Sequence, residues 1–203
     1  MNMKINWPNR GHKYSKDEID AVIEIMRDSK NQLTQGNCVS KFEDDFRNYL
    51  ESKNAFSLMS AAHALDISAN LIKIKEGDEV IIPAHTYCAT ALAFARKGAR
   101  IKWADICPKS FTVSLDSIKK LLSPKTKAIV VVHLYGLICP EIIEISELAK
   151  KNNIFLIEDC AQSLGAKFNG QHCGTFGDIG CFSFHSQKNL TTLGEGGMMV
   201  VKD

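Results

Sequence analysis

The sequence of 203 residues lacks several features that would place it in a familiar class at once. Its seven cysteines are odd in number and include no Cys-x-x-Cys pair, so we expect neither a disulfide framework nor a structural zinc site. No apolar run reaches the roughly 18 residues that cross a bilayer. Residues 1–18 also contain no apolar signal-peptide core. We therefore expect a cytoplasmic protein without a membrane partner.

A large net charge is also missing. Lys and Arg number 25 and Asp and Glu number 23, which gives a formal net charge of +2. Because this balance creates no strong field, we expect no nucleic acid partner, and any anionic substrate must be held by local groups. No Gly-x-Gly-x-x-Gly motif follows the early strands, which argues against a nicotinamide-binding domain. The length suffices for one domain with a sizeable core.

What is present is an alternation of helical and extended patterns. Helical periodicity predicts four helices, over 15–28, 38–50, 61–73 and 140–152. In the first, Ser15 is a plausible N-cap and one face carries Ile19, Val22, Ile23 and Met26. Short apolar runs predict seven strands, at 55–58, 79–82, 101–104, 127–132, 154–158, 180–184 and 197–201. This alternation favours an α/β fold with a mostly parallel sheet.

The connection between the last two strands differs from the others. Only about a dozen residues separate Phe184 from Gly197, and they show no helical pattern. A parallel crossover usually carries a helix of about 10 or more residues. We therefore predict that the last strand runs antiparallel to its neighbours. The glycine-rich stretch 170–180 is predicted to be a tight loop.

Two ionisable residues follow buried-type strands. Lys188 lies between the strand at 180–184 and a glycine cluster, where partial removal from water would make its amine a nucleophile toward an aldehyde. The alternative is a solvated surface lysine, which is the commoner case. Asp159 lies at the carboxyl end of the strand 154–158, where open α/β sheets bind ligands. It could face a cationic ring nitrogen or simply cap a turn.

Five further residues could complete a cofactor site. Ser60 and the backbone of Ala61 begin a helix, whose free N–H groups hold phosphate, although a simple N-cap is the commoner role. Tyr87 could stack on a planar ring or be a core aromatic residue. Gln162 could add a hydrogen bond, and Ser183 could contact a phosphate or a neighbouring strand. Together with a lysine and an acid, these groups meet the needs of pyridoxal phosphate.

Three stretches resemble the sugar aminotransferases of the DegT/DnrJ/EryC1/StrS type. They are GDEVIIPAHTYCAT at 77–90, the segment 157–189 that begins IEDCAQSLGA, and LGEGGMMV at 193–200. The resemblance covers about residues 5–203. It implies the fold type I architecture of pyridoxal phosphate enzymes, in which a three-layer sandwich holds a seven-stranded, mostly parallel sheet whose last strand is antiparallel. Residues 1–203 would then be an N-terminal segment and the large domain, without the family's small C-terminal domain.

The resemblance also implies roles in cofactor chemistry. Lys188 would attach to pyridoxal phosphate and then act as general base and general acid in a 1,3-proton shift. Asp159 would pair with the pyridinium nitrogen and keep the ring an electron sink. Gln162 would lie near the ring hydroxyl group, and Tyr87 would stack on the ring. No metal ion is implied.

For the phosphate group, the resemblance implies contacts from Ser60, Ala61 and Ser183. Relatives often have Gly-Thr or Ala-Thr before this helix, whereas this chain has Met59-Ser60. The serine hydroxyl group can replace that of threonine. His133 and His185 lie in matching stretches, and no role is assigned to either.

The leading interpretation is an aminotransferase that moves an amino group from glutamate or glutamine to a keto sugar, nucleotide-linked, in polysaccharide or amino-sugar biosynthesis. A homodimer is expected as well. One alternative is a sugar dehydratase of the same fold, but those relatives carry histidine in place of Lys188. Another is a non-catalytic fragment. We expect the 203-residue chain alone to bind the cofactor, to associate, and to turn over poorly.

Overall fold

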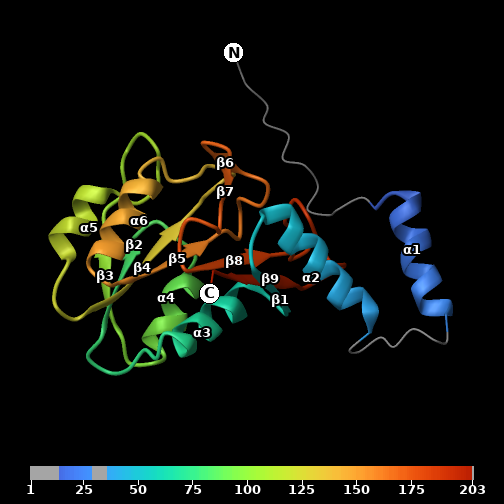
Figure 1. The fold of residues 1–203 in the computed structure, drawn as a ribbon, viewed down its shortest axis with the longest axis horizontal. Coiled ribbons are helices and arrows are strands. Elements are labelled where there is room, and N and C mark those ends of the chain that lie inside the picture. Colours follow the sequence, from blue (N-terminus) through green and yellow to red (C-terminus); the bar gives the residue numbers. More distant parts are fainter. Residues whose placement is uncertain (1–13, 29–35, 203) are drawn as a thin grey trace, which may run out of the picture.

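The computed structural model describes residues 14–28 and 36–202. Within them the helices are α1 Lys16–Arg27, α2 Asn37–Leu50, α3 Ala61–Leu71, α4 Cys88–Ala95, α5 Leu115–Leu121 and α6 Ile142–Lys151. The strands are β1 Asn54–Leu58, β2 Glu79–Pro83, β3 Arg100–Ala104, β4 Thr126–Val132, β5 Phe155–Asp159, β6 Lys167–Phe168, β7 Gln171–His172, β8 Ile179–Ser183 and β9 Gly197–Val201. Figure 1 shows helices on both sides of one sheet.

The main sheet has seven strands in the order β1-β9-β8-β5-β4-β2-β3. The pairs β2–β3, β2–β4, β4–β5 and β5–β8 are parallel, whereas β9 is antiparallel to both β8 and β1. The predicted seven-stranded, mostly parallel sheet with an antiparallel last strand is therefore confirmed. The residues between β8 and β9 form no helix, so the chain returns directly beside the strand that it has just left.

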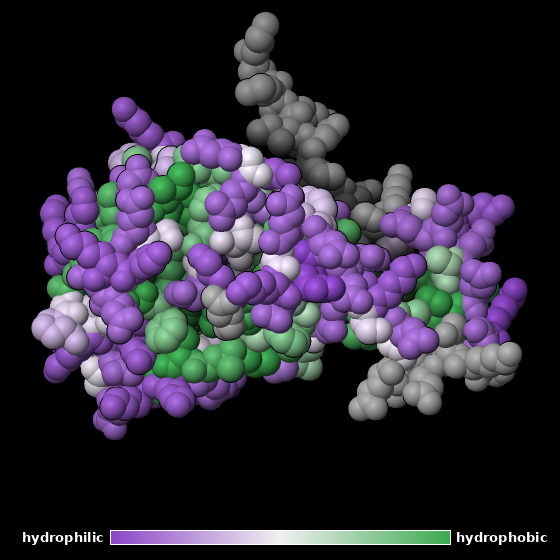
Figure 2. Space-filling view, in the orientation of Figure 1, coloured by the Kyte–Doolittle hydropathy of each residue, from purple (hydrophilic) through white to green (hydrophobic). Residues whose placement is uncertain are grey.

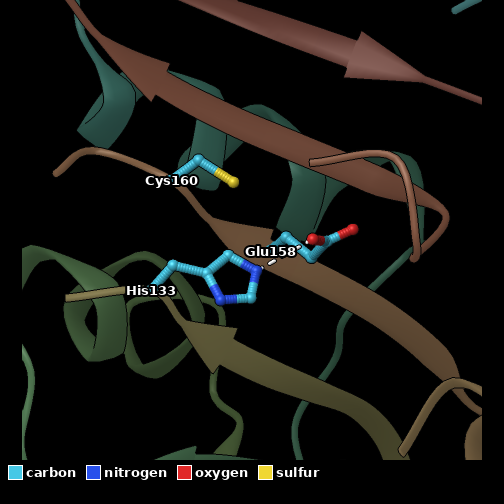
Figure 3. A group of neighbouring side chains, drawn as sticks. All are labelled: His133, Glu158 and Cys160. Atoms are coloured by element: carbon cyan, nitrogen blue, oxygen red, sulfur yellow. Dashed lines mark hydrogen bonds and ion pairs between the residues drawn. The ribbon is translucent and has the colours of Figure 1, made fainter. Parts of the chain in front are cut away.

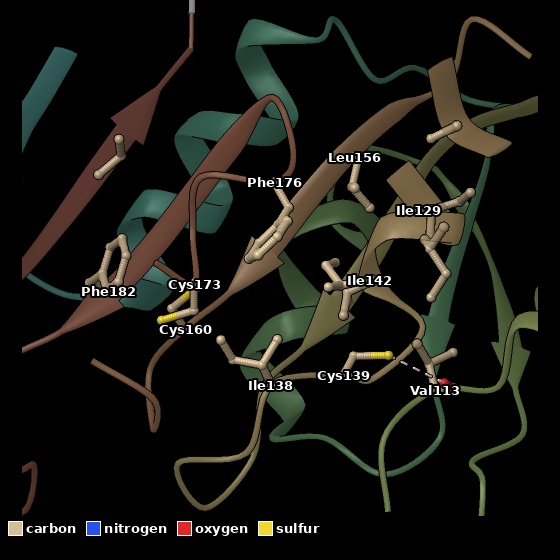
Figure 4. Close-up of a cluster of buried hydrophobic side chains, with 14 of the residues drawn as sticks. Val113, Ile129, Ile138, Cys139, Ile142, Leu156, Cys160, Cys173, Phe176 and Phe182 are labelled. Atoms are coloured by element: carbon tan, nitrogen blue, oxygen red, sulfur yellow. Dashed lines mark hydrogen bonds between the residues drawn. The ribbon is translucent and has the colours of Figure 1, made fainter. Parts of the chain in front are cut away.

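Helices on the two faces complete a three-layer sandwich. On one face, Leu65 of α3 and Phe94 of α4 pack into a buried cluster against the sheet. On the other face, Phe46 of α2, Ile118 of α5 and Ile142 of α6 belong to a second cluster, part of which is drawn in Figure 4. Each such side chain contributes about 1.5–3 kcal/mol when it is fully buried. The central strand β4 is buried on both sides over Ala128–Val132, as its apolar sequence predicted.

Several elements have no counterpart in the sequence prediction. Helix α4, with the sequence CATALAFA, is apolar at nearly every position and so shows little of the periodicity that marks a surface helix. Helix α5 has only seven residues. The prediction of a simple tight loop at 170–180 was wrong at its start, because β7 pairs with β6 in a small hairpin. Strands of two residues are too short for an alternating pattern to reveal.

Helix α1 begins where the sequence predicted, at a capping box. The Ser15 side chain accepts a hydrogen bond from the Glu18 N–H group at 3.2 Å, and the Glu18 carboxylate accepts one from the Ser15 N–H group at 2.6 Å. No residue of α1 is buried, and Met26 on its apolar face is 72% exposed. Figure 2 shows this helix with apolar residues bordered by polar ones. Among the described residues, no helix is long and apolar enough to span a membrane.

Candidate functional site

All seven candidate residues from the sequence lie around one pocket of about 710 Å³. They are Ser60, Ala61, Tyr87, Asp159, Gln162, Ser183 and Lys188. The sheet explains why they meet. Strands β5 and β8 are parallel neighbours whose carboxyl ends point to the same edge of the sheet; Asp159, the last residue of β5, pairs with Cys181, and β8 continues two residues further to Ser183. The N-termini of α3 and α4 lie at the same edge, where open α/β sheets bind ligands.

Asp159 is the buried acidic group of the pocket and is only 5% exposed, whereas Glu195, which also lines the pocket, has a 65% exposed side chain. Its Oδ2 atom accepts a hydrogen bond from Thr90 Oγ1 at 2.8 Å, and its Oδ1 atom accepts one from the Ala161 N–H group at 3.1 Å. Burial raises the pKa of Asp159, and these two hydrogen bonds and the nearby charge of Lys188 oppose the rise. The bond from the Ala161 N–H group to Oδ1 is the turn cap that the sequence offered as an alternative. The bond from Thr90 to Oδ2 is a further contact that a turn cap does not require.

Lys188 is the cationic group of the pocket and lies half-buried in the connection between β8 and β9. The backbone N–H group of Lys188 donates a hydrogen bond to the carbonyl oxygen of His185 at 2.8 Å. The connection folds back on itself, because the N–H group of Phe184 donates to the Gly196 carbonyl at 2.8 Å. These hydrogen bonds fix the backbone of Lys188 in the segment that follows the carboxyl end of β8.

Two serines make one side of the pocket suited to an anion. Ser60 is the N-cap of α3, and its Oγ accepts a hydrogen bond from the His63 N–H group at 3.1 Å. Ser183, at the end of β8, accepts one from the His185 N–H group at 3.4 Å. Because both oxygens act as acceptors in these bonds, both hydroxyl protons remain to be donated. With the positive end of the α3 dipole, this donor set fits a phosphate group.

Tyr87 and Gln162 lie at the mouth of the pocket. Tyr87 is 71% exposed at the N-cap position of α4, so the alternative of a core aromatic residue is wrong. Its ring is free of the core and can cover a planar ligand. The Gln162 Oε1 atom accepts a hydrogen bond from the Tyr135 N–H group at 3.2 Å, which leaves the donor end of that amide for a ligand oxygen.

Sequence reasoning missed Thr90, which lines the pocket and is fully buried. Its hydroxyl group also forms a 2.8 Å hydrogen bond with that of Thr86. A prediction of helix α4 from the sequence would have pointed to Thr90. Once this helix is placed over Cys88–Ala95, the buried side of its first turn faces the end of β5.

Glu158 forms a buried polar cluster with His133, which also lines the pocket. The two side chains are fully buried, and His133 Nε2 lies 2.9 Å from Glu158 Oε2. Figure 3 draws this contact as a dashed line. The Glu158 carboxylate also accepts hydrogen bonds from the N–H groups of Gly174 at 2.8 Å and Gly177 at 2.7 Å. His133 Nδ1 accepts one from the Cys139 N–H group at 3.2 Å, so its proton lies on Nε2. The cluster joins two loops to the end of β5.

The same cluster has the residue types of a metal site, because atoms of His133, Glu158 and Cys160 lie within 4.8 Å of one another. However, both ring nitrogens and both carboxylate oxygens already take part in hydrogen bonds within the protein. Burial also raises the pKa of Cys160 far above its usual value, which disfavours the thiolate that binds metals. The arrangement is thus that of a structural network.

Gly197, at the start of β9, allows the anion side of the pocket to form. A Cβ atom at this position would lie 2.4 Å from the Ser60 carbonyl carbon and 2.8 Å from the Ala61 nitrogen. Such distances require the backbone to move, because no flexible side chain can yield instead. The N-terminus of α3 therefore keeps its place only because residue 197 has no side chain.

We expect Gly197→Ala to displace the start of α3 and to weaken binding of pyridoxal phosphate about tenfold or more, with a loss of about 1–3 kcal/mol in stability. Fluorescence titration and thermal denaturation measure the two effects. Gly194→Ala is the matched control, because a Cβ atom at Gly194 would have no neighbour within 4 Å. Equal cofactor affinities for the two variants would contradict this account.

Comparison with known proteins agrees with the fold. The family model described as the DegT/DnrJ/EryC1/StrS aminotransferase family matches residues 12–203. A relative named GDP-perosamine synthase, from Escherichia coli O157:H7, is 42% identical over 170 residues, which are 84% of this chain and 46% of the relative. The chain thus spans about half the length of the curated relatives that it matches.

Solved structures show the same similarity. The X-ray structure of an aminotransferase from Psychrobacter cryohalolentis has a TM-score of 0.90 and 35% identity, over 98% of this chain and 49% of the other. A GDP-4-keto-6-deoxy-D-mannose-3-dehydratase from E. coli, with bound hydrated PLP, has a TM-score of 0.90 and 31% identity, over 98% of this chain and 51% of the other. The fold is that of fold type I enzymes, and the chain belongs to the DegT/DnrJ/EryC1/StrS aminotransferase family.

Proposed function

We propose that this chain is the cofactor-binding large domain of an aminotransferase that uses pyridoxal phosphate and a keto sugar nucleotide. The proposal rests on one observation. The half-buried Lys188 and the buried carboxylate of Asp159 line the same pocket, beside the N-terminus of α3. The family and the names of the relatives support both the reaction and a nucleotide-linked sugar as acceptor.

The pocket residues divide the work of such a site. Ser60, Ser183 and the first N–H groups of α3 would hold the phosphate, and Tyr87 would cover the ring. When it is bound, pyridoxal phosphate supplies an electron sink for negative charge that develops beside the amino nitrogen. Asp159 would hold a proton on the ring nitrogen. Lys188 Nζ would bind the cofactor covalently and would move the proton of the carbon that bears the amino group.

The dehydratase relative makes loss of water the second candidate reaction. Lys188 favours transfer, because an amine can both attach to an aldehyde and move a proton, whereas an imidazole can only move the proton. The assay supplies glutamate and a keto sugar nucleotide such as GDP-4-keto-6-deoxy-D-mannose to the complete protein. An amino sugar nucleotide formed together with 2-oxoglutarate supports the proposal. A deoxygenated sugar without amino transfer to it would overturn the proposal in favour of the dehydratase.

A second copy of the chain is the partner that we propose for α1. The apolar side of this helix exposes Ile19, Ile23 and Met26 to 48%, 37% and 72%. A face of this kind favours association.

All seven cysteines are free thiols, which supports a reducing, cytoplasmic compartment for the assembly.

Replacing Ile19 and Met26 together by glutamine should therefore weaken self-association. Light scattering over a range of concentrations measures it, and we expect the midpoint to rise about tenfold or more, because two apolar side chains no longer leave water. The double variant Asp20→Gln with Glu24→Gln, on the polar side of α1, is the control. If both double variants associate like the unaltered chain, α1 does not lie in the interface.

A further inference from the structure

The hydroxyl groups of two threonines form a chain that ends on the acidic group of the pocket. Thr86 Oγ1 lies 2.8 Å from Thr90 Oγ1, and Thr90 Oγ1 lies 2.8 Å from Asp159 Oδ2. Thr90 and Asp159 are buried, whereas Thr86 is partly exposed. The contact joins helix α4 to the end of β5, across 69 residues of sequence.

Because each hydroxyl group has a single proton, the direction of donation along this series of hydrogen bonds is fixed. An ionised carboxylate can only accept, so the single hydroxyl proton of Thr90 is donated to Asp159. Thr90 must then accept from Thr86, whose own proton is used in that bond. Hydrogen bonds arranged head to tail polarise and strengthen one another in a buried site. Protonation of Asp159 would make its carboxyl group a donor and would remove the reason for this order.

The carboxylate is also held at both of its oxygens. Thr90 donates to Oδ2, and the Ala161 N–H group donates to Oδ1. Each oxygen can accept more than one hydrogen bond, so capacity remains for a cationic ring N–H group. The two donors come from different elements and restrict rotation of the carboxylate about its own axis.

We propose that Thr90, oriented by Thr86, is a positioning residue that keeps Asp159 ionised and held toward the ring nitrogen of bound pyridoxal phosphate. This inference rests on the proposed function for its ligand, although the hydroxyl chain itself belongs to the cofactor-free protein. Thr90 acts through Asp159 and is assigned no contact with the reacting atoms.

Other groups around Asp159 also influence its charge. Glu158 and Cys160 flank it on the chain, His133 follows β4, Cys181 lies on β8, and Lys188 faces it across the pocket. The Nδ1 atom of His133 accepts a hydrogen bond from the Cys139 N–H group, and its Nε2 atom faces Glu158 and not Asp159. Burial of Asp159 favours its neutral form. Thr90 is the side-chain hydroxyl that opposes this effect by direct contact.

The test measures the ionisation of Asp159 in cofactor-free protein. Carbon NMR on protein labelled at aspartate follows the carboxyl resonance that Asp159→Asn removes. Thr90→Val keeps the shape of the side chain but deletes the donor, so the pH at which Asp159 titrates should rise. Thr90→Ser restores a hydroxyl group and should return the titration toward that of the unaltered protein. Pyridoxal phosphate should bind Thr90→Val about tenfold more weakly, as expected for the loss of a hydrogen bond to a charged group.

Thr112→Val is the matched control, because Thr112 is buried and its hydroxyl group bonds to Ser110 instead of a carboxylate. It should leave the Asp159 titration unchanged. If Thr90→Val does not fold, Thr86→Val decides, since it removes the donor to Thr90 and should shift the titration in the same direction by less. An unaltered titration in a folded Thr90→Val or Thr86→Val variant overturns the inference. Failure of the unaltered protein to bind pyridoxal phosphate overturns only the proposed function.

Discussion

Replacing Lys188 with alanine is expected to abolish covalent attachment of pyridoxal phosphate. The unaltered protein should show a visible absorption band with the cofactor, and borohydride reduction should fix the label to one peptide that contains Lys188. The physical reason is position, because the lysine shares its pocket with Asp159 and with two serines whose hydroxyl groups can hold a phosphate. Mass spectrometry of the reduced digest identifies the labelled residue.

The control for this experiment is Lys151→Ala, at the exposed end of α6. It removes the same functional group from a place far from the pocket lining, and it should leave both the band and the labelled peptide unchanged. A band of normal intensity in Lys188→Ala, or a label on a peptide without Lys188, would show that another amine carries the cofactor. Noncovalent binding to Lys188→Ala is compatible with the assignment, since the phosphate contacts remain.

Asp159→Asn should damage the chemistry far more than the fold. Asparagine has nearly the same shape and can still accept a hydrogen bond from Thr90, but it has no charge with which to keep a proton on the ring nitrogen. We expect cofactor binding to persist and the half-reaction with the amino donor to slow on the order of a hundredfold or more. Stopped-flow absorbance on the complete protein measures that step. A half-reaction at the parent rate would remove Asp159 from its assigned role.

The pH dependence of stability gives an independent check in cofactor-free protein. Because burial raises the folded-state pKa of Asp159 above its ordinary value of 3.8, its contribution to stability is fully present below about pH 3.8. That contribution is lost as the pH rises through the folded-state pKa. Urea unfolding across this window should therefore show a loss in the parent protein that is smaller in Asp159→Asn. Identical pH profiles would indicate that Asp159 titrates alike in the folded and unfolded states.

The fold could be predicted from the sequence to the extent that its signals are local. Apolar runs such as 127–132 indicated the buried strands, and the short connection after Phe184 indicated the reversed direction of β9. The positions of Asp159 at the end of a strand and of Lys188 between a strand and a glycine cluster, together with the family resemblance, were enough to select them. Helix α4 was missed because its sequence is apolar on all sides. Thr90 was missed for the same reason, since its place in the first turn of this helix is what points to it.

The sequence by itself determined the order of elements and the chemical types available at the edge of the sheet. Only the tertiary structure decided which of them touch. Thr90 meets Asp159 across 69 residues, and Gly197 lies against the backbone of Ser60 because β9 inserts between β1 and β8. Contacts of this kind depend on strand order and on distances of a few ångströms between distant segments, and a periodic pattern along one chain contains neither.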